Sequence, residues 1–430
     1  MRLSILPLAA FALTAQTIPL DWAAAMNRIR ADSMRGNLSF LASDLLEGRA
    51  TPSRGLDIAA EFIAAQFRRA GLEPGGNDGY FHNSQWGVPV PNRSNFSGRL
   101  RIGRETILLD SVNAFPIMSR PADLKNIPLL YVESDLKDVE GRAILIKAQN
   151  LASVSQKLTA AKPALIVVID PEGRSLFNRI RALRPHAASA KPVLPALDWL
   201  YIARDIEGSL GNAEISLKAE AVEDRPFTMK NVVGILRGSD PVLKDTYLFV
   251  TAHYDHEGMI PAGRGDRIFN GANDDGSGTA AVLELAESLS KLPHRPRRSI
   301  VFMTVAGEER GLQGSLAYLR APTVPLTKIV ADLNIEVLGR TDIDGSNIKS
   351  RITATGFDFT DLTDVLVQAG KETAVEVYRN ENSGDAYFRA SDNYSFAERG
   401  IPSHTIAAGF VYDDYHQVSD HWEKIDYDNM

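Results

Sequence analysis

The sequence has 430 residues, more than one compact core usually accommodates, so we expect two or three domains. Hydrophobic residues make up 44% and charged residues 23% of it, as in ordinary globular proteins. The net charge of −7 and the lack of a long basic run argue against nucleic acid or an anionic membrane as partner. Because cysteine is absent, disulfides and thiolate ligands are excluded, and any metal must be bound by nitrogen and oxygen atoms.

Residues 1–17 have the pattern of a short secretory signal peptide. Arg2 precedes an apolar stretch over Leu3–Leu13, and small residues follow. The stretch is too short to span a bilayer as a helix, and no other segment has the length and apolarity to do so. We therefore expect a secreted or periplasmic protein; the alternative for this segment is a buried N-terminal helix.

Residues 18–90 are predicted to be mainly helical. Apolar residues recur at helical spacing between Trp22 and Ile29 and again between Leu38 and Leu46. A third helix is expected from about 56 to 70, where Gly71 and the Pro-Gly-Gly that follows at 74–76 stop it. We expect these helices to serve as scaffold.

Residues 91–225 have a different pattern. Short β-like runs at 128–133, 142–147 and 164–169 alternate with loops and with one helix at about 151–161. This stretch contains no cluster of histidines and carboxylates. It predicts a small inserted α/β domain with a non-catalytic role.

Residues 226–430 alternate strictly between strand-like and helical segments. The expected strands cover 231–238, 247–252, 299–306, 328–335, 351–356 and 403–409. The expected helices cover about 279–291, 314–320, 359–370 and 393–399. Buried strands separated by helices predict an α/β fold with a doubly wound, mainly parallel sheet and helices on both of its faces.

Histidines and carboxylates follow the ends of four of these strands. In chain order they are His253 and Asp255, then Glu308 and Glu309, then Glu336, and after a loop His416. Asp274 lies in a glycine-rich loop between the first two groups. Open α/β sheets bind ligands at the carboxyl ends of their strands, so we expect these side chains to meet at one edge.

This set of side chains predicts a metal centre. Imidazoles and carboxylates without thiolates suit Zn²⁺, Mn²⁺ or Co²⁺, and two histidines with three carboxylates exceed the needs of one tetrahedral ion. A two-metal centre is therefore expected, with Asp274 as candidate bridge. Asp255 is expected to accept the second ring N–H of His253. Of the adjacent Glu308 and Glu309, one can bind metal while the other acts as general base.

These residues lie in motifs that closely resemble one known family. The motifs are HYDHEG at 253–258, GANDDGSGTAAVLELA at 271–286, GEERGLQGS at 307–315, LNIEVLGR at 333–340, SDNYSF at 391–396 and YHQVSD at 415–420. Their order and spacing over 231–430 resemble the M28 family of co-catalytic zinc peptidases. Residues 91–225 resemble, more weakly, the protease-associated (PA) domain that many members carry as an insertion.

The resemblance implies specific roles in a centre with two zinc ions, for which Co²⁺ or Mn²⁺ could substitute. His253 and Glu336 would bind one zinc, Glu309 and His416 the other, and Asp274 would bridge them. Glu308 would be the general base. The family also commonly has a cis peptide bond after the bridging aspartate. The implied activity is that of an exported aminopeptidase acting on peptides.

Four positions either depart from the commonest family pattern or are histidines outside the ligand set. Glu336 stands where aspartate is frequent, although some members use glutamate. Tyr387 is one residue away from the position of an oxyanion-stabilising tyrosine in some members, and Phe388 holds that position. Tyr387 is therefore a candidate for oxyanion or substrate contact only. His256 is not a ligand in the motif and is expected in a loop or pocket wall, while His404 is expected in the core.

Alternatives remain at this stage. A carboxypeptidase, a dipeptidase or a glutaminyl cyclase could use the same scaffold, and receptor-like relatives are binding proteins without catalysis. Such cyclases use one zinc, and a binding protein should have substituted ligands, whereas all five ligands and Glu308 are present here. Side-chain specificity and oligomeric state are not indicated by the sequence. Because relatives usually continue into a final helix after 425–428, the resemblance also suggests a truncated chain.

Overall fold

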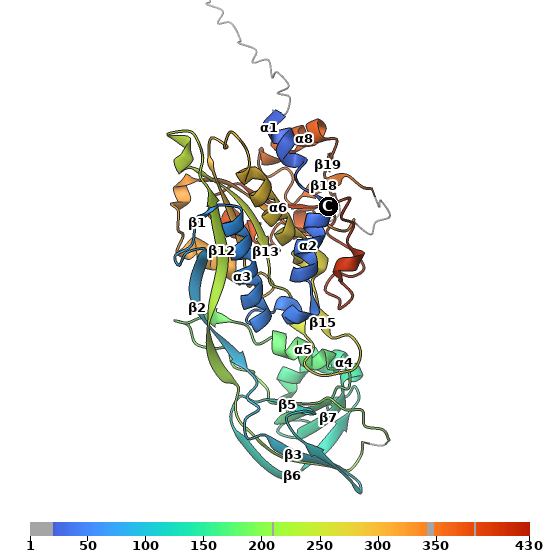
Figure 1. Ribbon diagram of the computed structural model, residues 1–430. Coiled ribbons are helices and arrows are strands. Elements are labelled where there is room, and N and C mark those ends of the chain that lie inside the picture. Colours follow the sequence, from blue (N-terminus) through green and yellow to red (C-terminus); the bar gives the residue numbers. More distant parts are fainter. Residues whose placement is uncertain (1–19, 209, 342–347, 382–383) are drawn as a thin grey trace, which may run out of the picture.

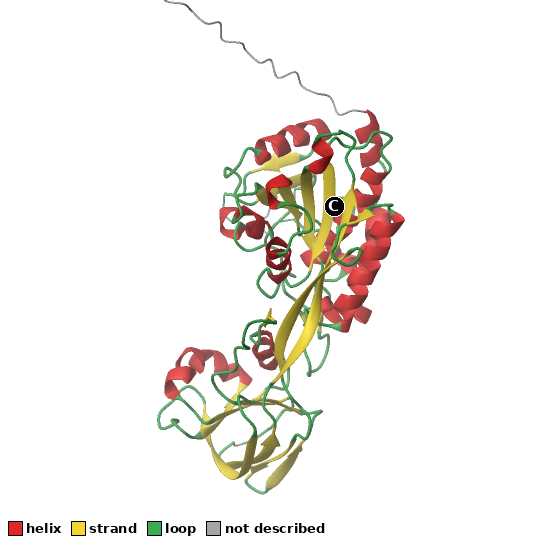
Figure 2. Cartoon of the chain, turned by 90° about the vertical axis from the view of Figure 1, so that its left-hand side faces the viewer, coloured by secondary structure: helices red, strands yellow, loops and turns green. Residues whose placement is uncertain are grey.

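The computed structural model describes residues 20–208, 210–341, 348–381 and 384–430 (Figure 1). The expected signal peptide at 1–17 lies outside these ranges. Within them, no helix combines the length and apolarity that crossing a membrane requires. Two bodies, each built on its own large sheet, are joined by a long two-stranded ribbon (Figure 2).

The larger sheet has ten strands and carries the candidate site. Its order is β19-β18-β20-β17-β13-β16-β12-β2-β9, with β1 paired to β12. The bounds are β1 Glu73–Pro74, β2 Phe81–Val90, β9 His186–Ala187, β12 Glu223–Leu236, β13 Tyr247–His253, β16 Ser299–Val305, β17 Ile329–Ile335, β18 Arg351–Ala354, β19 Glu376–Tyr378 and β20 Ser403–Ala407. The predicted strands from 231 onward are thus all present.

The sheet is mixed, so the prediction of a mainly parallel sheet holds only for its centre. Strands β20, β17, β13 and β16 are parallel to one another. On one side β18 pairs antiparallel with β20, and on the other β12, β2 and β9 pair antiparallel. Parallel neighbours need a crossover connection, and the predicted helices supply it between the central strands. The chain leaves the sheet along β2 and returns along β12, and such a pair of neighbouring strands is antiparallel.

Helices cover both faces of this sheet, as predicted. On one face α2, α3 and α6 share an apolar core with the strands; on the other, α7 and α10 do so. All seven residues of β16 are buried as a result. The bounds are α1 Leu20–Met26, α2 Ala31–Leu41, α3 Arg54–Arg69, α6 Gly278–Ser290, α7 Gln313–Arg320, α8 Leu362–Thr373, α9 Gly384–Tyr387 and α10 Asn393–Ala397.

Helix α3 shows why these sequences fold as they do. Ser53 caps its start by accepting the N–H of Leu56 at 3.1 Å, which satisfies one of the otherwise unpaired amides of the first turn. Apolar residues at helical spacing, Ala59, Ile63 and Phe67 among them, are fully buried against the sheet.

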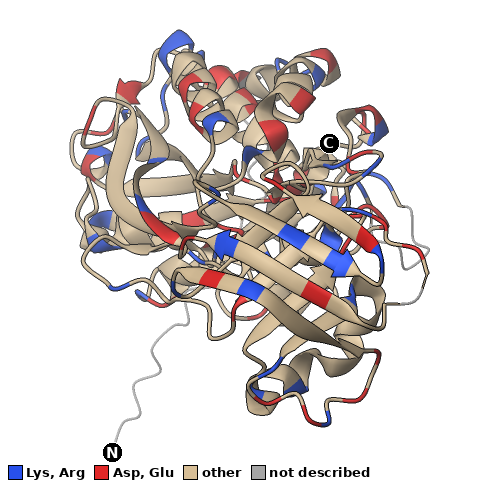
Figure 3. Cartoon of the chain, turned by 90° about the horizontal axis from the view of Figure 1, so that it is seen from below, with Lys and Arg blue, Asp and Glu red and all other residues tan. Residues whose placement is uncertain are grey.

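The second sheet has eight strands and its own apolar cores on both faces. Its strands are β3 Ser97–Ile102, β4 Glu105–Leu109, β5 Ala114–Ile117, β6 Ala122–Val132, β7 Ala143–Lys147, β8 Leu165–Ile169, β10 Trp199–Ile202 and β11 Ala213–Ala219, with helices α4 Ala148–Ala161 and α5 Arg174–Arg181. From below, Lys and Arg are interspersed with Asp and Glu across it (Figure 3). The sequence did not predict α5, although this helix turns out to lie beside the site.

The sequence predicted only part of the long ribbon formed by β2 and β12. The expected strand began at 231, whereas β12 begins at Glu223 and pairs with β2 over ten residues. The first residues of β12 are mostly exposed and include Pro226, so they carry little of the apolar pattern that marks a buried strand.

Candidate metal centre

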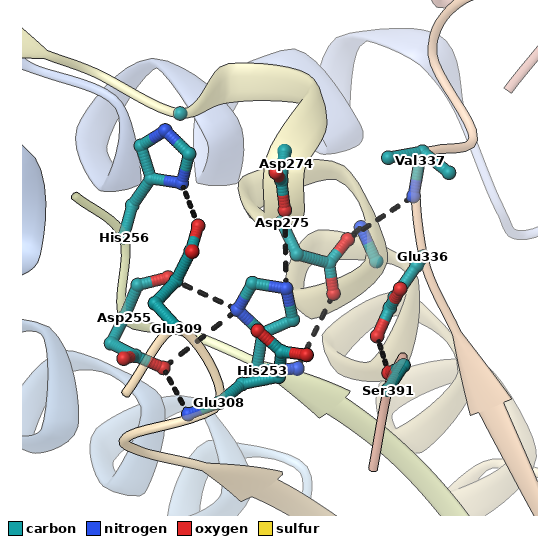
Figure 4. A network of polar contacts seen from close by, with 12 residues as sticks. His253, Asp255, His256, Asp274, Asp275, Glu308, Glu309, Glu336, Val337 and Ser391 are labelled. Carbon is teal, nitrogen blue, oxygen red and sulfur yellow. Dashed lines mark hydrogen bonds and ion pairs between the residues drawn. The ribbon is translucent and has the colours of Figure 1, made fainter. Parts of the chain in front are cut away.

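The five predicted ligands converge at the carboxyl ends of the central strands. Figure 4 shows four of them, His253, Asp274, Glu309 and Glu336. His253 is the last residue of β13, Glu336 follows β17, and Glu309 follows β16. Asp274 lies in the irregular segment η3 (Ala272–Ser277) before α6, and His416 follows β20 by a loop. Four of the five, all but Glu309, line one cavity together with Glu308. Its volume is about 50 Å³, enough for ions and a few water molecules.

Asp274 lies between two imidazoles. Its Oδ1 is 3.1 Å from Nε2 of His253, and its Oδ2 is 3.0 Å from Nε2 of His416. Glu309 Oε1 is 3.3 Å from the same nitrogen of His416. Ligand atoms on one tetrahedral ion with bonds near 2 Å lie roughly 3.3 Å apart, so these spacings fit metal coordination. Each carboxylate oxygen of Asp274 faces a different histidine, as a bridging carboxylate requires.

Glu336 reaches the cavity from the opposite side. Its Oε1 accepts a hydrogen bond from Nδ2 of Asn334 at 2.9 Å and another from the hydroxyl of Ser391. These donors hold the carboxylate in one orientation next to His253. With Asp274, Glu308 and Glu309 it makes four carboxylates around two imidazoles. A buried excess of negative charge is costly unless cations compensate it, so the donor set fits divalent ions.

The second nitrogen of His253 makes a different contact from the one predicted. Nδ1 lies 3.1 Å from the main-chain oxygen of Asp255 and 3.7 Å from the carboxylate. The carboxylate instead accepts the Thr51 hydroxyl at 3.0 Å and the main-chain N–H of Glu308 at 3.2 Å. Asp255 therefore orients His253 through its carbonyl. Because Nδ1 makes that contact, Nε2 is the ring nitrogen that faces Asp274 and is left for a metal.

Glu308 has the electrostatic environment of a proton acceptor and donor. Burial raises the pKa of Glu308 well above its ordinary value; Glu336 and Glu309 raise it further, while His253 opposes them. The residue as a whole remains partly exposed, because its carboxylate faces the cavity. A carboxyl group with a raised pKa gives and takes protons more readily near neutral pH.

The pKa values of two candidate ligands, Asp274 and Glu309, are shifted in the opposite direction, whereas burial raises the pKa of the third carboxylate, Glu336. Burial alone raises the pKa of Asp274, but its contacts with His253 and His416 lower it below the ordinary value. In the same way, His256 and His416 outweigh burial and hold the pKa of Glu309 well below its ordinary value. Both carboxylates are therefore ionised, which is the state that binds metal.

His256 lies closer to the centre than expected. Its Nδ1 is 2.9 Å from Glu309 Oε1, and His256, Asp274 and Glu309 form a group compact enough to hold an ion. Among the described residues, neither of its ring nitrogens makes a hydrogen bond of normal geometry. A second compact group consists of Glu257, Glu309 and His416. The sequence signal for this proximity is that His256 lies three residues after the candidate ligand His253. The family motif, however, has no ligand at the position of His256, and the prediction followed the motif.

Three further residues that the sequence did not single out hold the loop of Asp274. Asp275 accepts main-chain N–H groups from His253 and Val337, both at 3.3 Å, and from Gly278 at 3.0 Å (Figure 4). Asp420 accepts the N–H groups of Asn273 and Asp274. The peptide bond between Asp274 and Asp275 is cis, as the resemblance implied.

The third residue is Arg49, which is 1% exposed. Its guanidinium donates to four main-chain oxygens, those of Leu41, Tyr254, Asn270 and Gly271. Burial lowers the pKa of Arg49 to about 10, so it stays charged at neutral pH. One buried cation thus links the N-terminal helices to both motif segments.

Tyr387 and Tyr415 line the cavity. The ring of Tyr387 stacks on Phe410 at 5.3 Å, and that of Tyr415 stacks on His416 at 4.0 Å. Phe388 packs against Phe359 instead. Tyr387 therefore faces the cavity although it is one residue out of the usual spacing. His404 is buried and contacts Thr355 and Thr360, as expected of a core histidine.

Comparison with known proteins agrees with this geometry. The sequence of residues 231–430 matches the sequence model of peptidase family M28. Aminopeptidase YwaD of Bacillus subtilis is 26% identical over 336 residues, which cover 75% of this chain and 67% of that protein. A probable zinc metalloprotease of Pyrenophora teres f. teres is 31% identical over 172 residues, 38% of this chain. The match spans about a third (34%) of that relative's length.

Solved structures share the fold. The zinc aminopeptidase BSAP from Bacillus subtilis superimposes with a TM-score of 0.59 at 20% identity, covering 93% of this chain and 91% of that one. An aminopeptidase from Aneurinibacillus sp. strain AM-1 gives a TM-score of 0.55 at 18% identity, covering 95% and 92%. The resemblance of residues 231–430 to peptidase family M28, which the motifs indicate, is thereby confirmed.

Proposed function

We propose that this protein is an exported, zinc-dependent aminopeptidase that holds two zinc ions and removes N-terminal residues from peptides. The observation that carries the proposal is the carboxylate of Asp274, whose two oxygens face Nε2 of His253 and Nε2 of His416 at 3.1 and 3.0 Å. A carboxylate between two imidazoles is the arrangement that a pair of ions needs. The names of the Bacillus relatives support the aminopeptidase assignment.

In this proposal His253 and Glu336 would hold one zinc, Glu309 and His416 would hold the other, and Asp274 would contribute to both sites. Bound zinc supplies a Lewis acid for the scissile carbonyl and lowers the pKa of water to about 7. Glu308 takes a proton from the attacking water and returns it to the leaving amine. Its raised pKa suits both steps. Tyr387, on the cavity wall, is positioned to contact substrate or the developing oxyanion.

The remaining parts of the chain support the same proposal. Residues 1–17 would direct export, so the enzyme would act outside the cytoplasm. Residues 91–225, which contain the second sheet, would be a PA-like insertion, and 18–90 would complete the peptidase domain with 226–430. Helices α2 and α3, which lie within residues 18–90, share one apolar core with the large sheet, and this supports grouping 18–90 with 226–430.

Metal analysis combined with a peptide panel tests the proposal. The purified chain should contain about two zinc ions, and it should cleave peptides with a free N-terminus but not their N-acetylated forms. Cleavage of N-acetylated peptides alone would favour a carboxypeptidase instead. Cyclisation of N-terminal glutamine with one bound zinc would favour a glutaminyl cyclase. A chain without metal or turnover would be a binding protein.

A further inference from the structure

A second and larger pocket lies beside the metal centre. Its volume is about 350 Å³, which is in the range that ligand pockets occupy. It is lined by Asn178, Arg181, Ala182, Arg184, Glu309 and Arg310. The first four residues come from α5 and the turn after it, in the second body, and the last two follow β16. The candidate metal ligand Glu309 is thus part of its wall.

Close packing holds α5 in place against the peptidase part. Phe177 of α5 stacks on Phe269 with ring centres 4.7 Å apart, and Ile260 completes a small apolar cluster. At Gly173, just before α5, a Cβ atom would lie 1.9 Å from the main-chain oxygen of Ala262. Only glycine allows this approach, since real Cβ contacts are never so short. The position of α5, and of its arginines, is therefore set by packing.

The pocket gathers three guanidinium groups. Arg181 forms an ion pair with the buried carboxylate of Glu257 and lies 3.8 Å from Oε2 of Glu309. Arg310 donates to the main-chain oxygen of Leu183, while its Nε is buried without a hydrogen-bond partner among the described residues. Arg184 is exposed, and its side chain has no polar partner in the described part of the chain.

The charges in this pocket are incompletely compensated. The side chains of Arg181, Arg184 and Arg310 line the same pocket, so three like charges lie close together and repel one another. Glu309 is shared with the metal centre, and Glu257 is already paired with Arg181. An additional anion in the pocket would relieve the repulsion and could accept bonds from Arg184 and from Nε of Arg310. Guanidinium groups bind carboxylates in planar, paired geometry.

We propose that the pocket formed by Arg181, Arg184 and Arg310 binds a carboxylate of the peptide substrate. The inference rests on the proposed peptidase function and names a substrate class for it. A peptide residue spans about 3.5 Å, and Glu309 borders both sites, so the carboxylate belongs to a residue one or two positions beyond the scissile bond. It can be the C-terminal carboxylate of a short peptide or the side chain of an acidic residue.

Kinetics with matched peptides test the pocket and distinguish these sources. Leucyl-leucine is compared with leucyl-leucinamide for the C-terminal carboxylate, and leucyl-glutamate amide with leucyl-glutamine amide for the side chain. In the zinc-loaded full chain, kcat/KM should favour the acid of at least one pair. Arg184→Gln should reduce that preference about tenfold through KM, and Arg184→Lys should restore part of it. The control Arg204→Gln, an exposed arginine elsewhere on the second body, should leave the preference unchanged.

Equal rates for acid and neutral forms in both pairs, or an acid preference that Arg184→Gln leaves intact, would overturn the inference while peptidase function stands. Lack of turnover of all four peptides would contradict the proposed function instead. Calorimetry still tests the pocket in that case. Leucyl-leucine should bind the wild-type chain about tenfold more tightly than the Arg184→Gln variant, and equal affinities would overturn the inference.

Discussion

The carboxylate of Asp275 accepts the main-chain N–H of His253 at 3.3 Å. Asp275 is not itself a candidate ligand, but it fixes the end of β13, the strand that carries the candidate ligand His253. The other oxygen of Asp275 accepts the N–H of Val337, next to Glu336, and that of Gly278 at the start of α6. One buried carboxylate therefore sets the spacing between β13, β17 and α6. The metal centre depends on this anchor as much as on its ligands.

The first prediction concerns this anchor. Asp275→Asn keeps every candidate ligand but replaces one of the accepting oxygens by an NH₂ group, which cannot accept a main-chain N–H. We expect zinc affinity to fall about 10- to 100-fold, as is usual when a residue that orients ligands is changed. Competition with a chromophoric chelator measures this. Asp245→Asn, a change at an exposed aspartate, is the control, and unaltered affinity in Asp275→Asn would show that the anchor is dispensable.

The second prediction separates the two histidines near Glu309. His416 faces both Asp274 and Glu309, whereas Nδ1 of His256 faces Glu309. His416→Ala should therefore reduce bound zinc from about two ions to about one per chain. His256→Ala should keep both ions but bind the second more weakly, because Glu309 loses a neighbour that orients it. Metal content measured on both variants decides; the reverse pattern would make His256 the ligand.

The third prediction concerns the general base. Glu308→Ala removes a carboxylate that is not among the five candidate ligands, so zinc content should stay unchanged. Turnover should fall about 10²- to 10⁴-fold, since proton transfer loses its carrier. The measured quantities are kcat on a leucyl peptide and zinc per chain. Glu61→Ala, an exposed glutamate on α3, serves as control. Activity retained in Glu308→Ala would mean that another group accepts the proton.

The fourth prediction concerns pH and a carboxyl group outside the centre. Asp332 on β17 is fully buried between the hydroxyls of Thr251 and Ser403. Burial raises the pKa of Asp332 from 3.8 to about 7, although both hydroxyls oppose this. Between these values the unfolded chain releases a proton that the folded chain retains. The contribution of Asp332 to the free energy of unfolding therefore decreases as pH rises from about 4 to about 7.

Asp332→Asn should remove this dependence. Relative to wild type, the variant should gain roughly 1–4 kcal/mol in the free energy of unfolding between pH 4 and pH 8. Urea unfolding at several pH values measures the difference between the two proteins. Asp205→Asn, at an exposed position, is the control. A difference that does not change with pH would show that Asp332 is ionised throughout.

Much of the centre was predictable because its ligands follow buried strands directly. His253, Glu309 and Glu336 each lie within four residues of a strand end, and apolar runs mark those strands clearly. The mixed character of the sheet was harder to predict, since the exposed start of β12 carries no apolar pattern. The target of Nδ1 of His253 was also missed, because a main-chain oxygen has no signature in the sequence.

By itself the sequence determined the family, the strand–helix alternation of the large sheet and the order of the candidate ligands. These features depend on short-range patterns of apolar, acidic and histidine residues. Only the tertiary structure decided that Asp275, Asp420 and Arg49 hold the loop of Asp274, and that α5 brings Arg181 and Arg184 beside Glu309. Those contacts join residues more than a hundred positions apart or depend on main-chain atoms. For α5, the way the two bodies pack determines which residues meet, and packing is a property of surfaces that are complete only in the folded chain.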